Sequence, residues 1–587
     1  MSGSNAPWSL GSQGPVFFQG WHPFSTDTLA AGFAGAGGVG VVRMPAFPDM
    51  EAVTRRLAEA CRQGRGQVAL DLRGMVGEVS NRLDSAVHNL TDFLIHESDL
   101  LPERLEALRA WGLPRVVVVH DAEEAAAAQA NGASALLAAE GEGLRERLLR
   151  MVKATSLPTF APAGFGADAR DLLARGAAGL QLRSPALLRA GAAEWMSGFR
   201  QRVHDALGGT ILEGLVDSPA PKLPGLRIRN LKAAYPIIQG GMGIGISWDK
   251  LAGNVARSGC VGIVSAIGTG YRYPGLARMR AGRPDQPENL QNSEALHRII
   301  QEALRIADGR GPVGVNILCA INEYERVVRE SVDAGAQLII SGAGLPLTLP
   351  ELVGDRDVAL VPIVSSARAL KLICKTWQKR YGRLPDAVVL EGPESGGHQG
   401  FSLEQCQDPA FSLDALLPSV VQERDAWGDF PVIAAGGVWD RADIDRLMAL
   451  GAGGVQMGTR FIGTFECDAH PTFKEVILKS SRDTIQLHGS PVGMPARGVM
   501  TPLHQRIHAG TAPKIRCISN CVSPCEHGKG AAKVGYCIAD SLADSRGGDM
   551  ESGLFFTGSN GWKLDDLIPV RDLVGEITED YGLEGMA

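Results

Sequence analysis

A histidine follows two adjacent glycines in the stretch that runs from residue 391 to residue 400, EGPESGGHQG. Glycine has no Cβ, so Gly396 and Gly397 allow the backbone to come close to a bound ring. His398 can then reach that ring, and a histidine suits proton transfer near neutral pH. The alternative is a glycine-rich loop with a surface histidine, so the role of His398 depends on the rest of the chain.

Four cysteines are clustered toward the C-terminal end of the sequence. They follow the pattern C-x3-C-x3-C-x11-C and are Cys517, Cys521, Cys525 and Cys537. In a cytosolic chain such clustering favours metal or cofactor binding over disulfides. Four thiolates suit a [4Fe-4S] cluster and also a structural zinc ion, although the spacing is looser than that of common zinc ribbons. Most of the other six cysteines are expected to be core residues.

The composition is that of an ordinary soluble globular protein. Of the 587 residues, 45% are hydrophobic and 21% are charged, and the length suggests more than one domain. The formal net charge of −7 argues against a nucleic-acid partner. The sequence has no run of about 18 uncharged apolar residues and no signal-peptide pattern. We therefore expect a cytoplasmic protein without a membrane span, for which formation of a homo-oligomer such as a dimer stays open.

From Tyr235 onward, short apolar runs alternate with amphipathic segments, which favours βα units and a parallel sheet. Eight such units in about 230 residues fit an α/β fold of the TIM (β/α)8 barrel type, with the active site at the C-terminal ends of the strands. The strand candidates are 236–239, 261–266, 313–318, 337–341, 359–364, 387–390, 432–435 and 454–457. One connection, 268–311, is longer than a barrel needs and is expected to be a lid or binding surface, with a loop of no function as the alternative.

The first half of the chain looks like a degenerate copy of the second. The segment 29–42 (LAAGFAGAGGVGVV) recurs as 251–264 (LAGNVARSGCVGIV), and 157–183 parallels 430–458, in the same order along the chain. This pattern indicates a domain duplication. We expect a degenerate barrel-like domain in residues 1–216, a Pro-rich linker in 217–234, a TIM barrel in 235–482 and a C-terminal segment with the clustered cysteines in 483–587.

Five motifs of the second half resemble those of the nitronate monooxygenase and FMN-dependent enoyl-ACP reductase superfamily. They are PIIQGGMG at 236–243, VN at 315–316, EGPESGGHQG at 391–400, PVIAAGG at 431–437 and GVQMGTRF at 454–461. The motifs appear in the family's order. The resemblance implies that the TIM barrel binds FMN.

The clustered cysteines, together with GYCIAD at 535–540 and FFTG at 555–558, resemble the branch of this superfamily that carries a [4Fe-4S] cluster beside FMN. That branch acts as an acyl-ACP dehydrogenase/isomerase in unsaturated fatty-acid synthesis. The resemblance implies a flavin-dependent oxidoreductase that dehydrogenates or isomerises an acyl-ACP or acyl-CoA thioester and passes electrons from FMN to the cluster. The alternatives are a nitronate monooxygenase, an NAD(P)H-dependent enoyl reductase, and a non-catalytic redox-sensing scaffold that keeps flavin.

The resemblance also implies roles for single residues. His398 would be the acid/base over the flavin, and the four clustered cysteines would hold the iron–sulfur cluster. The residues expected to bind FMN are Gly241, Met242, Asn316, Glu391, Ser395, Gly396, Gly397, Gly436, Gly437, Gln456, Gly458 and Thr459. Backbone N–H groups of 436–437 and 458–459 would hold the phosphate. The first half has no SGGH stretch and places Arg183 and Ser184 in the later phosphate position, so we expect it to bind no flavin.

Overall fold

The computed structural model divides the chain into two compact units, with the boundary between Pro221 and Lys222. In the first unit the structure describes residues 16–19, 30, 33–34, 36, 38–43, 50–61, 67–73, 85–99, 102–139, 144–163, 171–182, 201 and 203. In the second unit it describes residues 222–276, 279–280, 283–287, 292–511, 515, 521–523, 525, 533–564 and 566–578. No helix within these ranges is long and apolar enough to cross a membrane.

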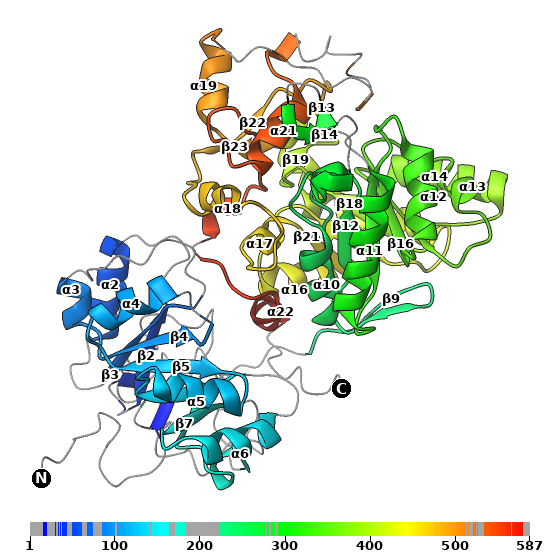
Figure 1. The fold of residues 1–587 in the computed structure, drawn as a ribbon. Coiled ribbons are helices and arrows are strands. Elements are labelled where there is room, and N and C mark those ends of the chain that lie inside the picture. Colours follow the sequence, from blue (N-terminus) through cyan, green and yellow to red (C-terminus); the bar gives the residue numbers. More distant parts are fainter. Residues whose placement is uncertain are drawn as a thin grey trace, which may run out of the picture. The chain divides into compact units, whose positions relative to one another are not determined.

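Eight parallel strands form a closed barrel in the first unit (Figure 1). The strands are β1 (Val16–Gln19), β2 (Val39–Arg43), β3 (Gln67–Asp71), β4 (Phe93–Glu97), β5 (Arg115–Val119), β6 (Ala135–Ala138), β7 (Thr159–Ala163) and β8 (Gly179–Leu182). The helices are α2 (Met50–Ala60), α3 (Ser85–Asn89), α4 (Pro102–Ala110), α5 (Ala122–Ala130) and α6 (Leu144–Ala154). Alternate strand residues such as Val116 and Val118 share one buried cluster, while Val117 and Val119 join another with the helices, as expected for strands buried on both faces.

The second unit is built on eight parallel strands in the order β11-β21-β20-β18-β17-β16-β15-β12. They are β11 (Ile237–Gln239), β12 (Gly262–Ser265), β15 (Val313–Leu318), β16 (Leu338–Gly342), β17 (Ala359–Val364), β18 (Val388–Glu391), β20 (Val432–Ala435) and β21 (Gly454–Met457). The edge strands meet through hydrogen bonds from Gln239 N to Val261 O and from Val261 N to Ile237 O, both 2.9 Å. The predicted α/β fold with a TIM barrel is therefore confirmed.

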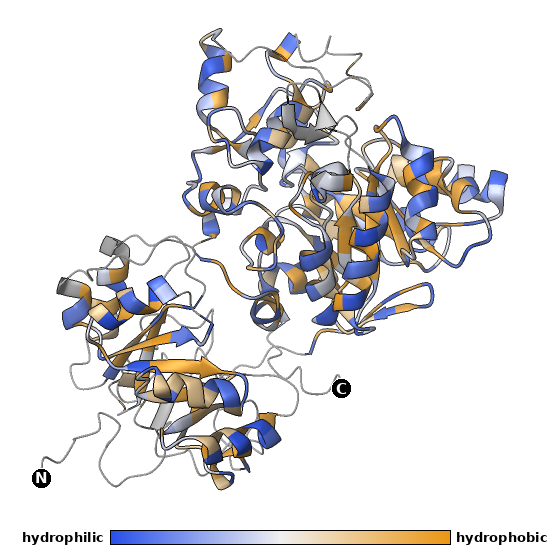
Figure 2. Cartoon of the chain, viewed as in Figure 1, coloured by the Kyte–Doolittle hydropathy of each residue, from blue (hydrophilic) through white to orange (hydrophobic). Residues whose placement is uncertain are grey.

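Helices surround this second barrel and turn hydrophilic faces outward, while the strands are mostly apolar (Figure 2). The helices between the strands are α10 (Asp249–Arg257), α11 (Ser293–Ala307), α12 (Tyr324–Asp333), α13 (Leu349–Val353), α14 (Ala367–Tyr381), α15 (Leu413–Asp425) and α16 (Arg441–Ala449). The short helix α17 (Thr459–Ile462) follows β21, and the 3-10 turns η5 (Gln405–Gln407) and η6 (Pro409–Phe411) precede α15. This arrangement exposes the loops after the strands at one end of the barrel.

Helix α11 lies within the connection 268–311 that is predicted as an insertion or lid. Residues 268–311 are expected to form one lid-like connection, but α11 is a regular barrel helix that packs closely on α10 through its apolar face. Its N-cap is Asn292, whose side chain accepts a hydrogen bond from Ala295 N (2.8 Å). The described part of the shorter insertion consists of η3 (Thr269–Tyr271), η4 (Pro274–Leu276) and the hairpin of β13 (Met279–Arg280) with β14 (Arg283–Pro287).

A small hairpin occupies part of the range that composition predicts as a linker. β9 (Leu226–Ile228) pairs antiparallel with β10 (Leu231–Ala233). The hairpin buries Leu226 and Ile228 in one cluster with barrel residues such as Ile238. Alternation of apolar with polar residues, as in Leu-Arg-Ile, is the physical reason, since it gives the strand one face to bury. The range 217–221 lies outside the described residues.

An antiparallel sheet of four strands, three of them from the C-terminal segment, joins that segment to the second barrel. The strands are β19 (Gly397–His398), β22 (Ile485–His488), β23 (Ala496–Val499) and β24 (Phe555–Phe556). The helices of this segment and the end of the barrel are α18 (Pro471–Leu478), α19 (Pro502–His508), α21 (Ile538–Arg546) and α22 (Val570–Thr578), with the 3-10 turn η7 (Gly561–Lys563). Figure 1 shows β19, β22 and β23 beside α21. The sheet is not among the sequence-based predictions.

One close contact between helix and strand is the same in both barrels. A Cβ added to Gly40 in the first barrel would overlap the backbone carbonyl of Ala30, and one added to Gly262 in the second would overlap that of Ala252. The two pairs are aligned in the repeated segments 29–42 and 251–264. The shared contact supports the inferred duplication. Arg183 and Ser184, on which the expected lack of flavin in the first barrel depends, lie outside the described residues.

We expect Gly262→Ala to destabilise the second unit by about 3 kcal/mol, because the added methyl group would force α10 away from β12. The urea midpoint of unfolding measures this loss. Gly275→Ala is the matched control, since a Cβ at Gly275 meets no atom within 4 Å. Equal midpoints for the two variants would contradict the prediction.

Candidate functional site

The residues expected to bind FMN gather at the C-terminal ends of five strands of the second barrel. Asn316 lies in β15, Glu391 ends β18 and Gln456 lies in β21. The other expected positions are on the loops directly after β11, β18, β20 and β21. Parallel strands of a barrel present these ends on one face, which explains why motifs spread over more than 200 residues meet.

Two pairs of expected residues are in direct contact. A Cβ at Gly241 would overlap the Asn316 side chain, so only glycine fits there. The sulfur of Met242 lies 3.5 Å from the position of a Cβ at Gly458. The hydroxyl of Ser247 accepts a hydrogen bond from Met242 N (2.9 Å) and so fixes the loop after β11. The loops after β11 and β21 thus meet beside β15.

Gly436 and Gly437, which follow β20, adopt a conformation that favours glycine. Their φ angles are 100° and 80°, values that strain any residue with a Cβ. A Cβ on Gly436 would also lie 2.9 Å from the carbonyl oxygen of Gly392, and one on Gly437 would overlap the carboxylate of Glu394. This geometry allows successive backbone N–H groups to face an anion, as the sequence predicts for a phosphate loop.

Residues 557–560 of the C-terminal segment close over the two expected phosphate loops. Gly558 N donates a hydrogen bond to Thr459 Oγ1 (2.8 Å), and Asn560 Nδ2 donates one to Gly437 O (2.7 Å). The sequence motif at 555–558 contributes to the family resemblance, but sequence analysis assigns it no function. The structure shows that this part of the chain joins the loops after β20 and β21.

Several buried polar atoms beside these loops have no hydrogen-bond partner among the described residues. They include Gln456 Oε1, Ser559 Oγ and Thr557 Oγ1. Buried polar groups are nearly always paired, so these three atoms are available to pair with a polar ligand. Ser559 is held near them by a hydrogen bond from its N to Glu394 O (3.1 Å). The residues present therefore fit a polar, phosphate-bearing ligand such as FMN.

His398 lies in β19, which pairs antiparallel with β23 so that His398 faces Ala496. Its Nε2 is 2.7 Å from Ser490 Oγ. The ring of Phe556 meets the imidazole edge to face, with centroids 5.5 Å apart. These contacts come from the C-terminal segment and hold the imidazole beside the glycine-rich loop.

The imidazole of His398 is neutral at pH 7. Burial is the main cause that lowers the pKa of His398 to about 4, and the nearby His488 adds to the effect. The ring of His488 stacks on Phe556 with centroids 6.1 Å apart and meets the ring of His504 at 4.5 Å. A neutral imidazole has a lone pair on one ring nitrogen and is able to accept a proton.

Glu391 is a second titratable group at the same end of the barrel. Burial raises the pKa of its carboxyl to about 7, and a hydrogen bond with Ser395 partly opposes this change. Gln399 Nε2 donates hydrogen bonds to Ser395 O (2.8 Å) and Gly397 O (3.0 Å) and so braces the loop between the carboxyl and His398. The site therefore has two groups that exchange protons near neutral or acidic pH.

Three of the four clustered cysteines lie in the described part of the chain. Cys525 and Cys537 are buried, and Cys521 is partly buried. Burial is the main cause that raises the pKa of Cys537 to about 11, and the proximity of Cys521 contributes to this shift. Within the described residues no group of three or more His, Cys, Asp or Glu side chains is arranged to hold a metal ion. Cys517 lies outside these residues, so the complete set is not described.

The segment that contains Cys521 and Cys525 is attached to the loop that follows β15. Val522 forms an antiparallel β-bridge with Ile321, and Ser523 N donates a hydrogen bond to Ala320 O (2.8 Å). This loop starts at the end of the strand that carries Asn316. The cysteine segment therefore lies at the same end of the barrel as the expected flavin site.

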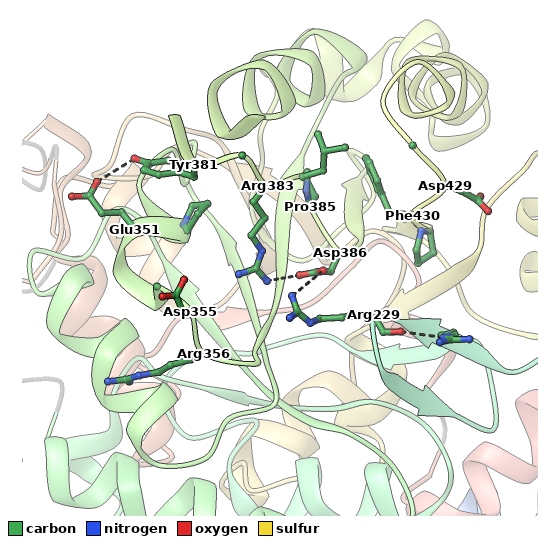
Figure 3. Close-up of a pocket in the computed structure, with 17 residues that line it drawn as sticks. Arg229, Glu351, Asp355, Arg356, Tyr381, Arg383, Pro385, Asp386, Asp429 and Phe430 are labelled. Atoms are coloured by element: carbon green, nitrogen blue, oxygen red, sulfur yellow. Dashed lines mark hydrogen bonds and ion pairs between the residues drawn. The ribbon is translucent and has the colours of Figure 1, made fainter. Parts of the chain in front are cut away.

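A groove of about 1150 Å³ lies elsewhere, against the loops that precede β17, β18 and β20. Arg229 and Arg383 point toward Asp386 in it (Figure 3) and form ion pairs with it at 3.8 and 2.8 Å. This is the N-terminal face of the barrel, which in this fold usually contributes to stability. None of the residues predicted for the site lines this groove.

Sequence reasoning assigns no role to Ser490, Tyr536, His488, Ser559 or Asn560, which the structure places around the expected site. The hydrogen bonds that bring Ser490, Tyr536, Ser559 and Asn560 to the site join residues about 47 to 165 positions apart, so no spacing rule connects them. The sole signal in the sequence is the family motif that contains Tyr536, which marks the residue without indicating its contacts.

Comparison with known proteins gives a consistent set of relatives. The family model described as "Nitronate monooxygenase" matches residues 226–580. The chain is 28% identical over 283 residues to a probable nitronate monooxygenase of Bacillus subtilis (strain 168), which covers 46% of this chain and 78% of that protein. It is 25% identical over 377 residues to the (3aS,4S,5R,7aS)-5-hydroxy-7a-methyl-1-oxo-octahydro-1H-indene-4-carboxyl-CoA dehydrogenase of Mycobacterium tuberculosis, with 59% of this chain and 92% of that one covered. Among solved structures, FabK from Thermotoga maritima matches with 26% identity and a TM-score of 0.45, over 60% of this chain and 94% of that one.

We expect Glu391→Gln to flatten the dependence of stability on pH. The folded-state pKa of about 7 exceeds the ordinary value of 4.5, so this carboxyl makes the wild-type protein lose stability as pH rises from 4.5 through 7. Each pKa unit is worth about 1.4 kcal/mol, which puts the loss on the order of 3 kcal/mol. The measurement is the urea midpoint of wild type and variant at pH 5 and pH 8, and parallel pH trends would contradict the assignment.

Proposed function

Because the chain belongs to the nitronate monooxygenase family, and is therefore a flavin-dependent oxidoreductase, we propose that its substrates are acyl thioesters carried on acyl carrier protein or CoA. The proposed reaction removes hydrogen from C2 and C3 of the acyl group, or moves the resulting double bond from the 2,3 to the 3,4 position. We propose FMN as the flavin and a [4Fe-4S] cluster as the second redox group.

The longer of the two reported sequence matches supports the choice of substrate. The relative from Mycobacterium tuberculosis is named as a carboxyl-CoA dehydrogenase, and its alignment spans 377 residues, against 283 for the Bacillus subtilis nitronate monooxygenase. Both matches exceed the eight-stranded barrel, and the 377-residue match extends further into the flanking sequence. The longer match to a carboxyl-CoA dehydrogenase therefore favours a thioester as the substrate.

The observation that carries the proposal is the buried, neutral imidazole of His398 at the mouth of the barrel. The thioester carbonyl acidifies the protons on C2, and a neutral imidazole can remove one of them. For isomerisation the same imidazole would remove a proton from C4 and return a proton to C2, which leaves the electron count unchanged. Dehydrogenation in addition releases a hydride from C3, for which bound FMN supplies the acceptor.

We assign FMN to five glycines and four polar residues of the mouth, of which Gly396 and Gly397 pack against Thr557 and Phe556 of the C-terminal segment. Gly241 allows close approach beside Asn316. Gly436 and Gly437 present backbone N–H groups suited to the phosphate. Gln456 Oε1 and Ser559 Oγ are buried without partners among the described residues and would pair with the ligand. The residues in question are Gly241, Asn316, Gly396, Gly397, Gly436, Gly437, Gln456, Thr459 and Ser559.

The iron–sulfur part of the proposal is supported by the cysteines and by where their segment is attached. Cys517, Cys521, Cys525 and Cys537 would provide four thiolate ligands. The bridge between Val522 and Ile321 holds their segment against a loop of the barrel mouth. A cluster there supplies one-electron transfer, through which the two electrons of the oxidation can leave.

A nitronate monooxygenase is the second candidate, favoured by the description of the family model and by the Bacillus subtilis relative. Both reactions begin at a carbon next to an electron-withdrawing group, so His398 suits either. Flavin reduction by acyl-ACP, acyl-CoA or a nitronate under anaerobic conditions separates the two candidates. Reduction by NAD(P)H would indicate an enoyl reductase, and a flavoprotein inert to all of them would indicate a scaffold.

We expect His398→Gln to lower kcat for acyl-thioester oxidation by about 10²- to 10⁴-fold, because a positioned base is lost. Flavin content should stay at the wild-type level, since the assigned phosphate loops are unchanged. His297→Gln, on the exposed face of α11, is the matched control and should keep full activity. An unchanged kcat in His398→Gln would falsify the catalytic assignment.

We expect anaerobically purified wild-type protein to contain one flavin and about four irons per chain, as a [4Fe-4S] cluster requires. Cys537→Ser should lose most of the iron and the associated visible absorption, while flavin remains. Cys374→Ser replaces a buried cysteine of α14 and should keep both. Zinc in place of iron, or equal iron in the two variants, would refute the cluster.

A further inference from the structure

We propose that Arg460 and Trp439 determine the selectivity of the flavin site for FMN over riboflavin, by holding the two expected phosphate loops at a fixed spacing. The inference rests on the proposed function, because it concerns the assigned FMN site. Arg460 and Trp439 would be positioning residues, since they connect the segments that follow the loops and act on the phosphate through those loops.

The two side chains come from the segments directly after the two loops. Trp439 follows Gly437 by two residues, and Arg460 follows Thr459 in α17. These segments leave β20 and β21, which are neighbouring parallel strands. The guanidinium carbon of Arg460 lies 4.7 Å from the centre of the Trp439 ring, and the two residues are only 9% and 8% exposed. Arginine stacks well on aromatic faces, and burial strengthens that attraction.

Helix α22 supplies an anionic partner for Arg460. A guanidinium nitrogen of Arg460 donates a hydrogen bond to Glu576 in α22, and the two side chains are 10% and 18% exposed. The same helix is joined to α16 by a hydrogen bond from Arg441 to Thr578 O (2.8 Å). Figure 1 shows α22 beside α16, the helix that follows Trp439. One helix therefore contacts the segments that follow both loops.

A second connection joins the loops through the C-terminal segment. Residues 557–560 are hydrogen-bonded to Thr459 Oγ1 and to Gly437 O. Lys563 follows them in η7 and places its ammonium nitrogen 5.7 Å from the centre of the Trp439 ring. The stack of Arg460 on Trp439 and the C-terminal segment thus connect the same two loops at separate points.

The charges favour a positioning role over direct binding of the phosphate. Arg460 is already paired with the carboxylate of Glu576, and Lys563 is exposed. The assigned phosphate donors are backbone N–H groups, whose hydrogen bonds weaken steeply when their geometry departs from the ideal. Loss of the stack should therefore weaken the binding of a phosphate-bearing flavin and leave the contacts of the flavin ring in place.

The first test measures the dissociation constants of FMN and riboflavin with the full-length apoprotein by equilibrium dialysis. Trp439→Ala should weaken FMN binding about tenfold, as expected for one lost hydrogen bond to a charged group, and keep riboflavin binding within about twofold. Trp439→Phe keeps an aromatic face for the guanidinium and should bind FMN nearly as well as the wild type. Trp562→Ala removes an exposed tryptophan of η7 and is the matched control.

Arg460→Lys tests the other half of the stack, because it keeps the charge but loses the planar group. It should lower FMN affinity as Trp439→Ala does, and the double variant should lose no more than either single variant, since both changes break one contact. Losses that multiply in the double variant would overturn the proposal. So would equal losses of FMN and riboflavin affinity in Trp439→Ala, or an FMN affinity as high as that of Trp562→Ala.

A second readout observes the phosphate itself in the holoenzyme. The phosphorus NMR resonance of bound FMN should move toward that of free FMN in Trp439→Ala and Arg460→Lys, while the visible absorption bands of the flavin stay unchanged. If neither variant folds, Glu576→Gln keeps the size of the side chain and should cause the same movement. A phosphorus resonance that stays in place would overturn the proposal. A wild-type protein that binds no flavin would instead overturn the proposed function.

Discussion

The pairing of β19 with β23 is the contact on which the mouth of the second barrel depends. β19 contains only Gly397 and His398, and it leaves the parallel barrel to join a sheet from the C-terminal segment. A glycine-rich loop loses much conformational entropy when it is ordered, so a single-residue anchor would hold it poorly. The antiparallel pairing and the contacts of Ser490 and Phe556 supply that anchor, and the burial that they create keeps the imidazole neutral.

The barrel itself is predictable because the sequence pattern that specifies each strand and helix lies within a short segment. A run such as Ala359–Val364 is apolar on both faces and is followed by an amphipathic helix, so each βα unit is visible in about 25 residues. The family motifs then indicate which strand ends carry polar groups. Local pattern does not separate a lid from a barrel helix in the connection 268–311, because the packing of α11 on α10 is a tertiary contact.

The remainder of the site depends on contacts between distant segments. His398 and Ser490 are 92 residues apart, and β22, β23 and β24 are short strands whose alternation is weak. Sequence spacing gives no rule for such pairs. The family resemblance suggests which residues would bind FMN, hold the iron–sulfur cluster and act as acid/base. The structure adds the residues that surround them, namely Ser490, Tyr536 and residues 557–560.

The order in which the chain is synthesised gives the C-terminal loop a particular consequence. Translation runs from the N-terminus, so all eight strands of the second barrel leave the ribosome before Gly558 and Asn560. Until those residues arrive, Thr459 and Gly437 lack the partners that tie their loops together. In a nascent barrel the two loops would therefore be unconnected, and residues 557–560 would join them only after the barrel strands have been synthesised.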